Sequence, residues 1–173
     1  MRSLLASLAL LVAACAHATS SGLLAPGHAA PEITLRDQAG IERSLSEFRG
    51  RPLVVYFYPK DGTPGCTREA CAFRDAWQRY TDANVALVGV STQDVASHAE
   101  FAREHELPFP LLADTEGRMA EAFGVARHLG LASRVTFVLD AQGIVRDVIE
   151  DVDVGVHADQ VLAAVARIQG TTP

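Results

Sequence analysis

The chain has 173 residues, which is enough for one domain with its own hydrophobic core. Its net charge is −6 at pH 7 and it has no run of basic residues, which argues against nucleic acid as a partner. It has no glycine-rich phosphate loop and no serine-hydrolase motif, so we expect no nucleotide cofactor.

Residues 1–18 are typical of an export signal. Arg2 precedes an apolar run from Ser3 to Ala14, which is too short to span a membrane and suits a signal peptide. Two endings stay open. Residues 12–15 resemble a bacterial lipobox, in which Cys15 would carry lipid, whereas residues 14–18 suit an ordinary signal peptidase. A buried N-terminal helix is the alternative to both. The sequence thus predicts an exported, periplasmic protein whose only link to the membrane would be a lipid on Cys15.

The remaining chain is predicted to contain a tether and one domain. Residues 19–30 are rich in Ser, Gly, Pro and Ala, which predicts a flexible tether, and the domain is expected over residues 31–170. Apolar periodicity separates its strands from its helices. The predicted strands are 32–35, 52–58, 84–91, 135–139 and 144–149; the predicted helices are 66–80, 94–106, 118–123 and 157–168, with one helical turn at 44–50.

This order of elements favours one fold class. Strands that alternate with helices, followed by a hairpin and a last helix, indicate an α/β domain with three layers, α/β/α, and a central mixed sheet. The continuous apolar run at 52–58 suits a strand that is covered on both faces. None of the six histidines has the spacing of a metal-ligand set, so we interpret them as surface or helix-end residues and expect no metal.

Cys66 lies where the sequence predicts the start of a helix. Thr63 suits the N-cap and Pro64 suits the first helical position, which places Cys66 in the first turn. Free backbone N–H groups and the helix dipole favour an anion there, and cysteines at such positions are often thiolates. Cys66 is therefore a candidate nucleophile, with a small apolar core residue as the alternative.

Cys71 follows five residues later in the same predicted helix. In an intact helix, two such residues have Cα atoms about 8.6 Å apart. A disulfide needs Cα atoms within about 7 Å. A bond between Cys66 and Cys71 therefore requires the helix to unwind from Cys66 to about Phe73. The alternative is that both thiols stay reduced and never meet.

The segment around these cysteines resembles a known family. Residues 59–66, PKDGTPGC, match the peroxiredoxin signature Pro-x-x-x-Thr/Ser-x-x-Cys. Residues 63–75, TPGCTREACAFRD, are similar to the bacterioferritin-comigratory, or peroxiredoxin Q, branch. The likeness continues through HELPFPLLAD at 105–114 and RVTFVLD at 134–140, and it covers nearly everything from about residue 31 to residue 168.

The resemblance implies a thioredoxin-like fold and a thiol peroxidase that reduces hydrogen peroxide and organic hydroperoxides. Cys66 would be the peroxidatic nucleophile and become a sulfenic acid, and Cys71 would resolve it as an intramolecular disulfide. Thr63 would hydrogen-bond the thiolate and the peroxide. Arg134 would fix the thiolate and polarise the peroxide, and Pro59 would shield the site from water.

The resemblance also implies a thioredoxin-like electron donor, which export would place outside the cytosol, and a monomer. Without the resemblance, Arg134 is equally well interpreted as a surface ion-pair residue. Lys60, Asp61 and Thr67 are expected to shape the loop. Two rival functions remain. A thiol–disulfide oxidoreductase would normally use Cys-x-x-Cys, which is missing here. A binding or scaffold domain with a structural disulfide would have to break its own helix to form it.

Overall fold

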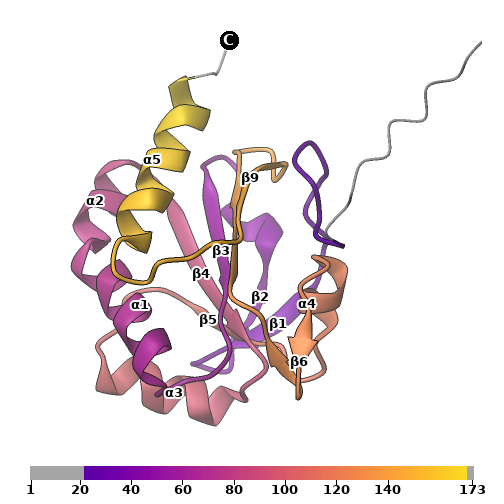
Figure 1. Ribbon diagram of the computed structural model, residues 1–173, viewed down its shortest axis with the longest axis vertical. Coiled ribbons are helices and arrows are strands. Elements are labelled where there is room, and N and C mark those ends of the chain that lie inside the picture. Colours follow the sequence, from indigo (N-terminus) through magenta and orange to yellow (C-terminus); the bar gives the residue numbers. More distant parts are fainter. Residues whose placement is uncertain (1–21, 171–173) are drawn as a thin grey trace, which may run out of the picture.

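The computed structural model describes residues 22–170, which form a seven-stranded sheet with helices on both faces (Figure 1). The predicted signal peptide and Cys15 lie outside the described residues. Within residues 22–170, no helix is both long and apolar enough to cross a bilayer.

The elements follow the predicted alternation. The strands of the main sheet are β1 (Thr34–Asp37), β2 (Glu42–Ser44), β3 (Leu53–Phe57), β4 (Ala86–Ser91), β5 (Leu111–Ala113), β8 (Val135–Leu139) and β9 (Val145–Ile149). The helices are α1 (Pro64–Asp75), α2 (Trp77–Asp82), α3 (Val95–Glu104), α4 (Arg118–Ala122) and α5 (His157–Gly170), with a 3-10 turn η1 (Leu45–Phe48). A separate small hairpin pairs β6 (Arg127–His128) with β7 (Leu131–Ala132).

The strand order is β2-β1-β5-β4-β3-β8-β9, and the sheet is mixed, as predicted. β3, β4 and β5 are parallel, whereas β8 pairs with the other side of β3 and runs antiparallel to it. This pairing places the residue before β8 beside the end of β3, because Phe57 is opposite Val135. The loop that leaves β3 and the chain that enters β8 therefore meet at one edge of the sheet.

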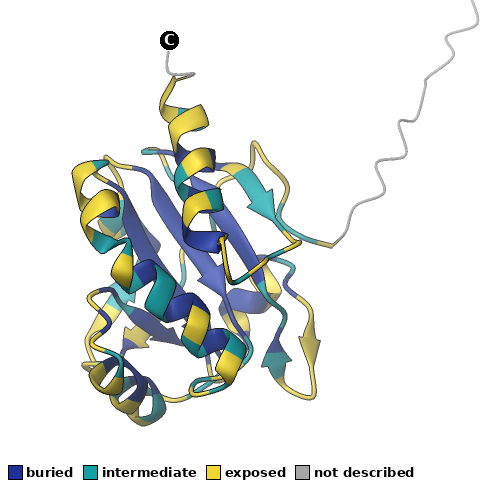
Figure 2. Cartoon of the chain, turned by 60° about the vertical axis from the view of Figure 1, so that its left-hand side comes forward, coloured by how far each residue is buried: buried dark blue, intermediate teal, exposed yellow. Residues whose placement is uncertain are grey.

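The sheet separates two hydrophobic cores. Along β3, Val54 and Tyr56 face the core that α1, α2, α3 and α5 cover, whereas Val55 and Phe57 face the core that α4 covers. Figure 2 shows the central strands buried and the outer helix faces exposed. The continuous apolar run in β3 is thus explained by burial on both faces, as the sequence predicts.

Two details differ from the sequence prediction. The predicted tether does not extend over the whole of 19–30: Leu24 donates to the Phe123 carbonyl, and Ala29 forms a β-bridge with Ile144. The single predicted helix at 66–80 is divided at Ala76 into α1 and α2. Apolar spacing alone cannot show this break, because the apolar face continues from α1 into α2.

Candidate active site

Cys66 occupies the third position of α1 and is 2% exposed. Pro64 is the first helical residue, as predicted, and Thr63 is the N-cap by position. The Thr63 side chain differs from the prediction, since it makes no capping hydrogen bond and does not bond to Cys66. Its hydroxyl donates instead to the Lys60 carbonyl at 3.0 Å. The first-turn N–H groups of α1 are thus left without a side-chain cap, and they can face an anion at Cys66.

Arg134 directly precedes β8 and reaches the Cys66 sulfur. Its Nη2 donates to Sγ at 3.1 Å, and its Nη1 donates to the Glu69 carboxylate. Burial lowers the pKa of Arg134, but the charges of Glu69 and Cys66 outweigh this and raise it above its usual value. Its side chain is 20% exposed, so the ion pair is not the surface pair that we considered as the alternative.

Glu69 is a site residue that the sequence reasoning missed. It lies one helical turn after Cys66 and is fully buried. Burial raises the pKa of Glu69 to about 7, against the opposing effect of Arg134. Its Oε1 has no hydrogen-bond partner and lies 3.6 Å from Nε2 of His157. The signal was present in the sequence, because a glutamate three residues after Cys66 shares its helix face.

Two histidines are fully buried, and one of them, His98, corrects our interpretation of all six as surface or helix-end residues. His157 is a helix-end residue, since it begins α5, but it is buried behind Glu69, and its Nε2 lies 2.9 Å from the Thr136 hydroxyl. Burial lowers the pKa of His157 to about 4, so its ring is neutral at pH 7. His98 on α3 is also fully buried. Their burial depends on long-range packing, which sequence spacing does not report.

Cys71 lies on α1, is half-buried and has a free thiol, as does Cys66. Both belong to one continuous helix, so the helical geometry that keeps them too far apart for a disulfide applies here. Pro59 is half-buried in the loop between β3 and α1. Within residues 22–170, no group of three His, Cys, Asp or Glu side chains is placed to hold a metal ion.

This arrangement suits nucleophilic chemistry at sulfur. A buried thiol stands at a helix N-terminus with a guanidinium 3.1 Å from it, and a buried carboxylate holds that guanidinium from behind. A negative charge on the sulfur is thus stabilised by fixed donors. The same guanidinium has the geometry to stabilise charge that develops on an atom leaving from the sulfur.

Comparison with known proteins assigns the chain to a family. The family model for the AhpC/TSA family matches residues 26–148. The chain is 49% identical over 127 residues to the chloroplastic peroxiredoxin Q of rice, Oryza sativa subsp. japonica. That match covers 72% of this chain and 58% of the rice protein, so the chain spans little more than half the length of this relative.

Solved structures extend the likeness to the fold. Peroxidoxin BcpB from Mycobacterium tuberculosis is 40% identical and has a TM-score of 0.78, over 83% of this chain and 97% of that one. The bacterioferritin comigratory protein of Xanthomonas campestris is 35% identical with a TM-score of 0.74, over 79% and 91%. These matches share the thioredoxin-like fold, and the chain belongs to the AhpC/TSA peroxiredoxins, on the side of peroxiredoxin Q and the bacterioferritin comigratory proteins.

Proposed function

We propose that the chain is a thiol peroxidase that reduces hydrogen peroxide and organic hydroperoxides. The observation that carries the proposal is the contact of Arg134 Nη2 with Cys66 Sγ at the N-terminus of α1. The bacterioferritin comigratory protein of Xanthomonas campestris, which has an alkyl peroxide reduction activity, supports the same reaction class for this chain.

The first step is an attack of the Cys66 thiolate on one oxygen of the peroxide. The S–O bond forms as the O–O bond breaks, and the leaving oxygen takes a proton and departs as water or an alcohol, leaving a sulfenic acid. Arg134 stabilises both the thiolate and the leaving oxygen. The Thr63 hydroxyl proton is directed at Lys60, so its oxygen is free to accept a hydrogen bond from the peroxide, while Pro59 limits the access of water.

The second step joins the two cysteines. The Cys71 thiolate attacks the Cys66 sulfenic sulfur, the disulfide forms and water leaves. Because both residues stand on α1, the step requires the first turns of the helix to unwind. A thioredoxin-like dithiol then reduces the disulfide and returns both thiols.

The cellular setting remains a proposal that rests on residues 1–18, which carry the pattern of an export signal. We propose a periplasmic monomer served by an exported thioredoxin-like donor, with a membrane anchor only where Cys15 carries lipid. Fractionation of expressing cells tests the periplasmic location. Mass analysis of the mature N-terminus, compared between the wild type and a Cys15→Ser variant, tests the lipid on Cys15. Recovery of the full-length, unprocessed chain in the cytosol would contradict export.

The catalytic proposal is tested by a single turnover. Reduced protein is mixed with one equivalent of hydrogen peroxide, and Trp77 fluorescence and intact mass are followed. Rapid formation of a Cys66–Cys71 disulfide supports the proposal. A reaction no faster than that of free cysteine contradicts it and leaves a non-catalytic domain with a misleading motif.

A further inference from the structure

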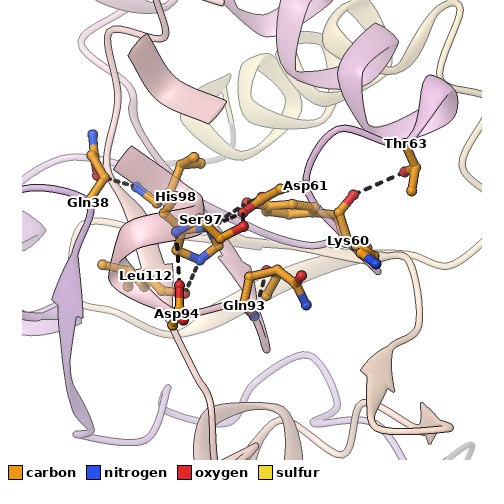
Figure 3. Close-up of polar contacts among 12 residues, drawn as sticks. Gln38, Lys60, Asp61, Thr63, Gln93, Asp94, Ser97, His98 and Leu112 are labelled. Atoms are coloured by element: carbon orange, nitrogen blue, oxygen red, sulfur yellow. Dashed lines mark hydrogen bonds and ion pairs between the residues drawn. The ribbon is translucent and has the colours of Figure 1, made fainter. Parts of the chain in front are cut away.

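The loop between β3 and α1 is held in place by one carboxylate. Asp61 accepts hydrogen bonds from the Tyr58 hydroxyl at 2.7 Å and from the Ser97 hydroxyl at 2.7 Å, and it lies 2.8 Å from Nδ1 of His98. Figure 3 shows Asp61 pointing into this cluster, with Thr63 and Lys60 bonded to each other on its other side. The loop that contains Pro59 and Thr63 is thus fixed to α3.

The His98 ring has acceptors at both of its nitrogens. Nδ1 faces Asp61, and Nε2 lies 3.2 Å from the carbonyl oxygen of Leu112 in β5. A carbonyl can only accept, so Nε2 must carry a proton. The Tyr58 hydroxyl, 3.4 Å from Nδ1, donates its proton to Asp61 and turns a lone pair toward the ring. Each polar atom near the two ring nitrogens is therefore placed to accept a hydrogen bond from a ring N–H.

One proton remains to be shared between Nδ1 and Asp61. The carboxylate already receives two hydroxyl donors, which favours its ionised form. Burial raises the pKa of Asp61, but the hydrogen bond and charge of His98, together with the two hydroxyl bonds, hold it below its usual value. The two hydroxyl donors to Asp61 and the carbonyl oxygen at Nε2 thus favour a second ring proton, on Nδ1 of the fully buried His98.

Among residues 22–170, no other charged group contacts this ring in place of Asp61. The titratable groups that contact it are Asp61 in the loop and Tyr58 directly after β3. Asp94, at the start of α3, accepts from the Ser97 N–H. Asp114, after β5, accepts from the N–H groups of Met119 and Ala120. The pair is therefore isolated in a buried setting, where each partner depends on the other.

We propose that Asp61 and His98 form a buried carboxylate–imidazolium pair that positions the loop preceding Cys66. The expected effect of the pair on Cys66 oxidation rests on the proposed peroxidase function, whereas the existence of the pair does not. Asp61 is bonded to α3, Lys60 is bonded to Thr63, and Thr63 directly precedes the helix that presents Cys66. The pair acts through this chain of contacts, so both are positioning residues rather than catalytic ones.

The first test reads the protonation of His98 in the reduced wild-type protein. A long-range ¹H–¹⁵N correlation spectrum at pH 7.5 separates an imidazolium, with both ring nitrogens protonated, from a neutral tautomer. We expect the imidazolium pattern for His98 and the neutral pattern for His157, which serves as the internal control. A neutral His98 at pH 7.5 would overturn the proposal, whatever the enzymatic activity.

The second test separates charge from hydrogen bonding. Asp61→Asn keeps the shape but removes the charge, and Ser97→Ala removes a neutral donor to the same oxygen of Asp61. We expect Asp61→Asn to slow Cys66 oxidation by about 10-fold to 100-fold, as misplaced reacting groups do. Ser97→Ala should stay within about fivefold, the size of one neutral hydrogen bond.

A readout without peroxide keeps the two proposals apart. Alkylation of Cys66 by iodoacetamide, located by peptide mass, should be faster in Asp61→Asn because a displaced loop uncovers the thiol. Ser97→Ala should alkylate like the wild type. Equal alkylation in both variants and equal rates of Cys66 oxidation would overturn the positioning role. If Cys66 of the wild type is alkylated slowly but does not react with peroxide, the result contradicts the peroxidase function alone.

Discussion

Glu69 imposes a cost on stability that grows with pH, and Glu69→Gln should remove it. Burial raises the pKa of this carboxyl from 4.5 to about 7. A folded-state pKa above the unfolded value gives a stabilisation that is complete below pH 4.5 and is lost as the pH rises through about 7. The difference corresponds to about 3 kcal/mol, and about 2–3 kcal/mol of it falls between pH 5 and pH 8.

Urea unfolding of the reduced protein at pH 5, 6, 7 and 8 measures this cost. We expect the stability of Glu69→Gln relative to the wild type to rise by about 2–3 kcal/mol from pH 5 to pH 8. His157 has the opposite sign, because burial lowers its pKa to about 4 and its stabilisation is lost as the pH falls through that value. Glu100→Gln, on the exposed side of α3, is the matched control and should show no such trend.

The result that would refute this reasoning is a pair of parallel stability curves for wild type and Glu69→Gln. It would mean that Arg134 compensates the buried carboxylate fully and that Glu69 stays ionised in the folded protein throughout this range. The unpartnered Oε1 argues against that, because only one of the two carboxylate oxygens meets the guanidinium.

Three further predictions concern the cysteine site. The Cys71→Ser variant should react with one peroxide only and keep one added oxygen on Cys66, which intact mass detects. If no added oxygen is found after the reaction, Cys71 is not the resolving thiol. Arg134→Lys should slow Cys66 oxidation by about 100-fold in stopped-flow fluorescence. Losing one preorganised donor commonly lowers a rate by that factor, and lysine cannot bond Cys66 and Glu69 together as the guanidinium does. An unchanged rate would assign Arg134 to structure only. Oxidation should unwind the start of α1 and so speed hydrogen exchange of the backbone amides in residues 64–72, while the amides of α5 stay protected. Equal exchange rates in the reduced and oxidised proteins would exclude the unwinding.

Several features could be predicted from local sequence because they depend on near neighbours. The apolar run of β3 indicated burial on both faces, and Pro64 marked the first turn of α1, which placed Cys66 at a helix N-terminus. The five-residue spacing of the cysteines already showed that one helix keeps them apart. The family resemblance then added Arg134, which no local pattern linked to Cys66.

Only the tertiary structure decided which distant side chains meet. Arg134 reaches Cys66 because β8 pairs with β3 and brings the two chain segments to one edge of the sheet. The same packing buries Glu69 and His157 against each other and aims Asp61 at His98. Periodicity reports which face of an element is apolar, but a polar side chain is buried only when another element supplies its partner. That partner is set by strand order and helix docking, which are properties of the whole chain.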